Sequence, residues 1–209
     1  GIIFGNLNNE NLNSFYPYLR VVTYGTTPGV FISGKIVEKF PLLTVEWTKN
    51  GQKNHIKTHL VGAYNLENIL AAICIASYFE VEDEKINHAI SNYIPQNNRS
   101  QQKQTLNNYL IIDAYNANPT SMKAALDHFL ALPANPTIVI LGEMKELGTY
   151  REEEHQKLIN YLSNTSLNQV LLIGESFSIL APIKDNWKTF LSTDQLITFL
   201  QNTSLQGYT

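Results

Sequence analysis

A carboxylate and two carboxamides lie close together in the segment 113–118, where Asn116 and Asn118 follow Asp113. The preceding residues 109–112 are typical of a strand, and Pro119 is a favoured first residue of a helix. The three polar side chains are therefore predicted at the carboxyl end of a strand, where open α/β sheets bind ligands. Asn118 also fits a structural role as a helix N-cap, but capping does not account for Asp113 and Asn116 in the same short turn.

A second pair of carboxamides, Asn65 and Asn68, is three residues apart in an Ala-rich helical pattern. This spacing puts both side chains on one helix face, and an amide offers the donor and the acceptor that the edge of a purine requires. The alternative is that Asn65 caps the helix and Asn68 is only solvated.

A glycine turn with two carboxylates, residues 142–148, follows another apolar run at 137–141. Glu146 in this turn and His155 in the helix that follows are candidate functional residues. His155 could equally pack against its own helix, and the sequence leaves both roles open.

Two basic positions raise the question of phosphate binding. Arg99 lies in a polar segment, and its planar guanidinium suits phosphate oxygens, although a linker arginine can also be merely solvated. The run Gly29-Val-Phe-Ile-Ser-Gly-Lys-Ile has the glycines and lysine of a phosphate-binding loop. We reject that interpretation, because Ile36 replaces the Mg²⁺-binding hydroxyl and Val-Phe-Ile predicts a strand.

The elements that position these residues follow two patterns. The first sixty residues alternate apolar runs with turn residues, and Asn50-Gly51 indicates a hairpin. Helices are predicted over 65–79 and 82–92. The expected strands in this part cover residues 1–4, 19–24, 30–33 and 42–47.

From residue 109 the pattern changes to strand, helix, strand, helix, strand, and a last helix is predicted over 193–201. This alternation indicates an α/β fold with a mostly parallel sheet. The polar segment 95–104 is interpreted as the junction between two domains, 1–97 and 98–209. The expected elements are 109–113, 119–130, 137–141, 151–162 and 169–173.

The composition excludes several classes of protein. A net charge of −3 gives no reason to expect binding of nucleic acid, which would need a clustered basic face. The single cysteine, Cys74, lies in an apolar run and cannot form an internal disulfide, which fits a reducing compartment. No apolar run is long enough for a membrane span, and the first residues do not show a basic region followed by an apolar signal core, so a cytoplasmic protein is expected.

Four motifs together resemble the Mur ligase family, and the match covers about half of the chain, from residue 60 to 160. The Tyr-Asn-Ala-Asn-Pro spelling favours the branch that adds D-alanyl-D-alanine. In the fourth motif Glu143 replaces the family's commoner Asp. The motifs are Gly62-Ala-Tyr-Asn-Leu-Glu-Asn-Ile-Leu-Ala-Ala, Asn98-Arg-Ser-Gln, Asp113-Ala-Tyr-Asn-Ala-Asn-Pro-Thr-Ser-Met, and Ile140-Leu-Gly-Glu-Met-Lys-Glu-Leu-Gly with Glu152-Glu-Glu-His.

The resemblance implies the end of a central ATPase domain followed by a Rossmann-like carboxy-terminal domain. It implies an ADP-forming ligase of peptidoglycan synthesis that uses ATP and Mg²⁺ to join D-alanyl-D-alanine to a UDP-N-acetylmuramoyl tripeptide, acting as a monomer. The implied roles are nucleotide binding by Asn65, Asn68, Arg99 and Asp113, catalysis by Asn116, Asn118 and His155, and substrate binding by Tyr115, Ser121 and Glu146.

Both ends of the chain look truncated when set beside this family. Its phosphate loop, Mg²⁺ carboxylate and modified lysine are expected before residue 1, and a lysine motif after residue 209. We therefore expect the 209 residues alone to be inactive. The alternatives are a sister Mur ligase or folylpolyglutamate synthetase that adds a single amino acid, a nucleotide-binding module, or a non-catalytic interaction protein.

Overall fold

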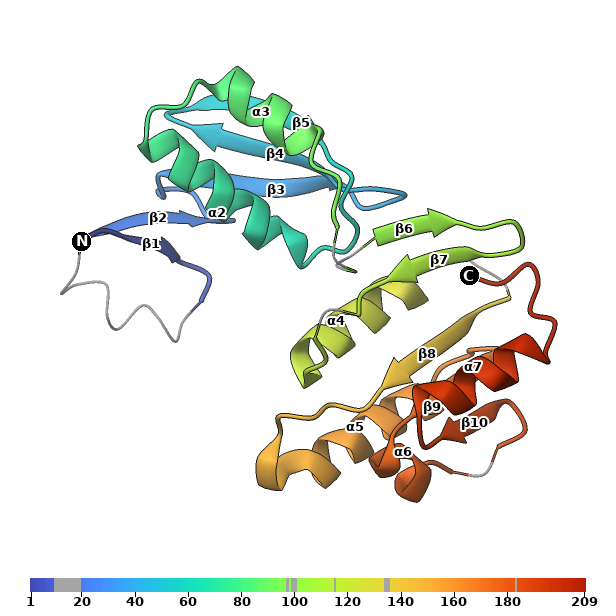
Figure 1. Ribbon diagram of the computed structural model, residues 1–209. Coiled ribbons are helices and arrows are strands. Elements are labelled where there is room, and N and C mark those ends of the chain that lie inside the picture. The colour runs from blue at the N-terminus through green and yellow to red at the C-terminus, as the bar shows by residue number, and fades with distance from the viewer. Residues whose placement is uncertain (10–19, 97, 99–100, 115, 134–135, 183) are drawn as a thin grey trace. The chain divides into compact units, whose positions relative to one another are not determined.

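The computed structural model describes residues 1–9, 20–96, 98, 101–114, 116–133, 136–182 and 184–209. The chain forms two compact units, Gly1–Gln96 and Asn97–Thr209 (Figure 1). Within the described ranges, no helix is both long and apolar enough to cross a membrane.

The first unit contains a five-stranded sheet in the order β1-β2-β3-β4-β5. The first three strands pair in parallel and the last three in antiparallel fashion. Asn50 and Gly51 have φ values of 50° and 81°, as the predicted hairpin turn between β4 and β5 requires. The strands are β1 (Ile3–Asn6), β2 (Val21–Gly25), β3 (Ile32–Glu38), β4 (Thr44–Lys49) and β5 (Gln52–Lys57).

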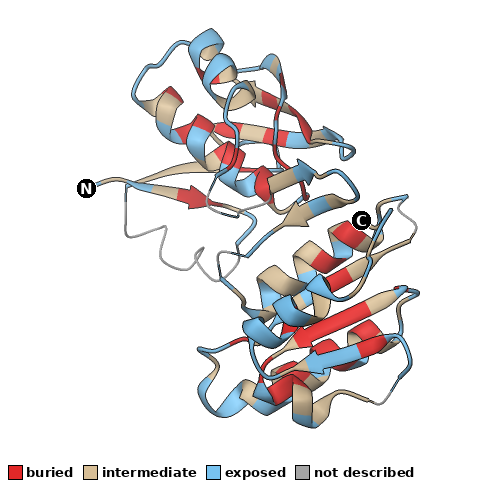
Figure 2. Cartoon of the chain, turned by 45° about the vertical axis from the view of Figure 1, so that its right-hand side comes forward, coloured by how far each residue is buried: buried red, intermediate tan, exposed pale blue. Residues whose placement is uncertain are grey.

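Two helices pack on this sheet, α2 (Asn65–Tyr78) on β1 to β3 and α3 (Asp83–Ser91) on β5. The apolar side chains of α2 and the sheet form one core, in which Trp47 and Ile32 are fully buried. Figure 2 shows buried residues both on the helix and on the strands of this unit. Strand β3 begins at Ile32, two residues later than predicted, so only the second half of the segment that mimics a phosphate loop is a strand, and residues 29–31 form a turn and bend before it.

The second unit contains a parallel sheet in the order β10-β9-β8 and a separate antiparallel pair, β6-β7. Helices α4, α5 and α6 line its apolar core, which includes Leu126, Leu172 and Phe177. The strands are β6 (Gln101–Gln104), β7 (Tyr109–Ile112), β8 (Ile138–Gly142), β9 (Gln169–Ile173) and β10 (Trp187–Phe190). The helices are α4 (Pro119–Leu130), the 3-10 turn η2 (Gly148–Tyr150), α5 (Arg151–Ser163), α6 (Glu175–Leu180) and α7 (Thr193–Gln201).

Residues 207–209 hydrogen bond to both β7 and β8. The amide of Tyr109 donates to the Tyr208 carbonyl (3.0 Å), the amide of Ile138 donates to the Thr209 carbonyl (2.9 Å), and the amide of Thr209 donates to the Pro136 carbonyl (3.0 Å). The pairing of Thr209 with β8 is that of parallel strands. In Figure 1, β7 and β8 point in the same direction, so their carboxyl ends share one edge of the unit.

The predicted α/β fold with a mostly parallel sheet is confirmed. Strand β5 was implied only by the hairpin signal at Asn50-Gly51, and β6, η2, α6 and β10 were not predicted. Gln101–Gln104 form β6, although their polar composition indicated a linker, because this strand pairs with β7 through its backbone and leaves polar side chains exposed or half-buried. Helix α6 and strand β10 are too short to show a clear hydrophobic period.

Candidate functional site

The turn that carries Asp113 begins where β7 ends, one residue earlier than predicted. Asp113 and Asn116 are exposed at this carboxyl end, and the amide of Ala114 donates to the Asn98 carbonyl (2.8 Å). The side-chain oxygen of Asn116 accepts from the amide of Ala117 (2.9 Å). The predicted position of the carboxylate at a strand end is therefore confirmed, whereas Tyr115 lies outside the described residues.

Asn118 and Ser121 form a capping box at the start of α4. The Asn118 side chain accepts from the Ser121 amide (2.9 Å), and the Ser121 hydroxyl accepts from the Asn118 amide (3.3 Å). Pro119 follows as the first helical residue. The capping role considered for Asn118 is present, and any contact with substrate would be in addition to it.

Replacing Asn118 with alanine is expected to lower the free energy of unfolding of the second unit by about 1 kcal/mol, because the Ser121 amide loses its acceptor. Urea unfolding with far-UV circular dichroism measures the change. Thr120→Ala is the matched control, since Thr120 is exposed in the same helical turn. Equal effects of the two substitutions would contradict the capping role.

The asparagine pair of the first unit lies at the start of α2. Asn65 is buried; its side chain donates to the Val61 carbonyl (2.7 Å) and accepts from Asn68 (3.2 Å), which is exposed. Gly62 supports this turn, since its φ is +82° and an added Cβ would lie 2.2 Å from the ring of Tyr64. Asn65 thus orients the side-chain amide of Asn68. The predicted phosphate contact, Arg99, lies outside the described residues.

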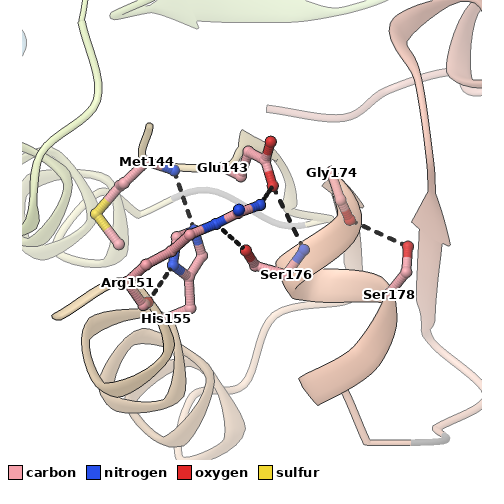
Figure 3. A network of polar contacts seen from close by, with 7 residues as sticks. All are labelled: Glu143, Met144, Arg151, His155, Gly174, Ser176 and Ser178. Carbon is pink, nitrogen blue, oxygen red and sulfur yellow. Dashed lines mark hydrogen bonds and ion pairs between the residues drawn. The ribbon is translucent and has the colours of Figure 1, made fainter. Parts of the chain in front are cut away.

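A polar network holds the loop after β8 (Figure 3). Glu143 accepts from the Arg151 guanidinium (2.9 Å) and from the Ser176 amide (3.4 Å), and Arg151 also donates to the Ser176 hydroxyl (2.7 Å). Burial by itself would raise the pKa of Glu143, but the hydrogen bonds from Arg151 and Ser176 outweigh it and lower that pKa from 4.5. Glu143 is therefore a carboxylate at neutral pH.

His155 is fully buried beneath this loop, and both of its ring nitrogens are engaged. Nε2 accepts from the Met144 amide (3.0 Å), and Nδ1 donates to the Arg151 carbonyl (2.6 Å) (Figure 3). This pattern of contacts requires the tautomer that carries its proton on Nδ1. Its ring also packs edge-on against Phe177, with 4.9 Å between centroids. Of the two roles left open by the sequence, packing is the one that this geometry favours.

Glu146 is exposed in the same loop, which follows β8, whereas Asp113 follows β7. These two strands belong to different sheets and end at the same edge of the unit (Figure 1). In the part of the chain that the structure describes, no group of three or more His, Cys, Asp or Glu side chains could hold a metal ion. The exposed carboxylates of Asp113 and Glu146 can accept hydrogen bonds from a ligand, and the exposed amide of Asn116 can donate or accept them.

Sequence reasoning missed Arg151 and Ser176. Their partner Glu143 was noted only for its departure from Asp, and Ser176 lies in the unpredicted helix α6. A contact between residues 25 positions apart has no periodic signal, so only the fold brings these side chains together.

Comparison with known proteins places this geometry in a family. The model of the Mur ligase glutamate ligase domain matches residues 98–205, which is more than half of the chain. The chain belongs to the Mur ligase family.

Individual relatives agree with this assignment. The UDP-N-acetylmuramoyl-tripeptide–D-alanyl-D-alanine ligase of Rickettsia prowazekii is 37% identical over 97 residues, 45% of this chain and 22% of that protein. The ligase of the same name from Bacillus subtilis is 31% identical over 137 residues, 65% and 30% respectively. The crystal structure of MurF ligase from Thermotoga maritima in complex with ADP superposes with a TM-score of 0.79 at 17% identity, covering 100% of this chain and 48% of that one. The chain thus spans less than half the length of each.

Proposed function

We propose that this chain is part of an ATP-dependent, ADP-forming ligase that joins D-alanyl-D-alanine to UDP-N-acetylmuramoyl tripeptide in peptidoglycan synthesis, and so serves cell wall biogenesis, cell shape and cell division. The observation that carries the proposal is the turn after β7, where an exposed carboxylate and an exposed carboxamide follow the carboxyl end of a strand. The carboxyl ends of strands are where open α/β sheets bind ligands. The names of the curated relatives support this choice of substrates.

In the proposed reaction, ATP phosphorylates the terminal carboxylate of the tripeptide, and the amine of the dipeptide attacks the acyl phosphate. Asp113 would bind the ribose of the nucleotide, and Asn116 would lie near the reacting phosphate. Asn68 would contact the adenine with Asn65 behind it, since only Asn68 has an exposed amide. Arg99 would contact phosphate. Such a site acts by positioning and electrostatic stabilisation.

The amine substrate would be received by Glu146, whose exposed carboxylate can accept hydrogen bonds from an ammonium group. Tyr115, Ser121 and Asn118 remain proposed contacts of the substrates. His155 would act through the loop that it supports, because its ring has no exposed surface. Mg²⁺ would accompany ATP. We propose a monomer in the cytoplasm, which fits a free cysteine, Cys74.

Asp113→Ala in the complete enzyme is expected to lower turnover about tenfold or more, or about 1.4 kcal/mol in the barrier, because the ribose loses a charged partner. Steady-state ADP release at saturating dipeptide measures this effect. Asp185→Ala is the control, since Asp185 is exposed in the turn before β10. Unchanged turnover in Asp113→Ala would remove this residue from the site.

A further inference from the structure

Three elements of the second unit meet at one cluster of side chains. Glu143 follows β8, Arg151 begins α5 and Ser176 lies in the first turn of α6. The guanidinium of Arg151 bridges the other two, with 2.9 Å from Nη2 to the Glu143 carboxylate and 2.7 Å from Nε to the Ser176 hydroxyl (Figure 3). The backbone adds a further contact, from the Glu143 amide to the Ile173 carbonyl (2.9 Å).

The carboxylate of Glu143 fits a space that only glycine leaves open. Gly174 has a φ of +128°, and an added Cβ would lie 2.6 Å from the Glu143 carboxyl carbon. The Glu143 side chain retains only 18% of its exposure, so it lies against the start of α6 and does not extend into solvent. A side chain at position 174 would therefore displace the Glu143 carboxylate from its present position.

These contacts fix both ends of the loop between β8 and α5. Glu143 and Arg151, which bound the loop, are joined by their own ion pair, and the Met144 amide is held by His155. Glu146 lies between the two fixed ends and is exposed. A loop that is tied at both ends presents its intervening side chains in a restricted range of positions.

We infer that Glu143, Arg151 and Ser176 form a clamp that positions the loop carrying Glu146, so that Glu143 acts through Arg151 and does not itself contact substrate. A planar guanidinium suits this role, because it can bond a carboxylate and a hydroxyl at once with fixed geometry. The clamp itself is supported by these contacts alone. Its kinetic consequence rests on the proposed function, in which Glu146 receives the amine.

Hydrogen exchange of the 209-residue chain tests the clamp without any activity. In Arg151→Met, the amides of residues 144–150 are expected to exchange about tenfold faster, while those of α7 are unchanged. Lys157→Met is the matched control, because Lys157 is also a paired cation on α5 but its partners are Glu153 and Glu154 on the same helix. Equal exchange of the loop in the wild type and Arg151→Met would overturn the clamp.

Kinetics of the complete ligase test whether the clamp serves the amine site. Arg151→Met and Glu143→Gln are each expected to raise KM for the dipeptide about fivefold with KM for ATP unchanged, and the double variant should be no worse than the more severe single one. For Arg151→Lys, the KM for the dipeptide should lie between those of the wild type and Arg151→Met, since an ammonium group lacks the planar fork that bonds both partners at once.

Additive effects of the two substitutions on this KM would overturn the inference, because they would mean that Glu143 acts independently of Arg151. Absence of dipeptide-dependent activity in the wild type would refute the proposed function, while the exchange experiment would still decide the clamp.

Discussion

Trp47→Ala is expected to lower the free energy of unfolding of the unit Gly1–Gln96 by about 3–5 kcal/mol. Trp47 is fully buried in β4, so truncation leaves a large cavity in the core of this unit. Its indole nitrogen also donates to the side-chain oxygen of Asn87 (2.8 Å), which would lose this donor. A loss of this size is comparable to the whole stability of many small domains.

The two tryptophans allow the two units to be followed separately. Trp187 is buried in the second unit and becomes the single tryptophan of Trp47→Ala. Urea unfolding should therefore show an early transition by circular dichroism and an unchanged midpoint by Trp187 fluorescence. Val37→Ala is the control on the same sheet, since Val37 is 50% exposed. An equal shift of the Trp187 midpoint would contradict independent unfolding of the units.

His155→Ala is expected to lower the free energy of unfolding of the second unit by about 3 kcal/mol. The substitution opens a cavity beside Phe177 and leaves the Met144 amide and the Arg151 carbonyl without the partners that His155 provides. A buried polar group that loses its partner destabilises the fold by more than the hydrogen bond contributed, because no water replaces the lost partner.

The neighbouring residue provides a matched control for this substitution. Gln156 is on the same helix, and its side chain donates only to Asn160 on the helix surface, so Gln156→Ala should change the unfolding free energy by less than about 0.5 kcal/mol. Urea unfolding of the 209-residue chain compares the two. If His155→Ala were as stable as the wild type and the same change abolished turnover in the complete enzyme, His155 would be a catalytic residue and the packing role would be wrong.

Elements with a strong local signal were predicted well from the sequence. Helices α4 and α7 have the predicted bounds, because Asn118 and Ser192 cap them and their apolar spacing is regular. The run Gln169–Ile173 is a strand as predicted, since Val170–Ile173 are continuously apolar and the strand is an inner one of the parallel sheet. In these segments the local preference and the fold agree.

The candidate site was predicted only as far as local signals reach. The position of Asp113 at a strand end follows from the apolar residues before it, and the structure confirms that position. The burial of His155 and the bridging role of Arg151 follow from contacts with α6, which the sequence did not predict. The roles that we propose for the site residues in binding the substrates and in catalysis remain predictions.

Release of ADP by the complete enzyme tests the proposed function most directly. The protein from the full reading frame is supplied with ATP, Mg²⁺ and UDP-N-acetylmuramoyl tripeptide, and D-alanyl-D-alanine, single amino acids or glutamate are offered in turn. We predict release only with the dipeptide. Release with a single amino acid in place of the dipeptide would assign the chain to another branch of the family, and no release with any amine would contradict the proposed reaction.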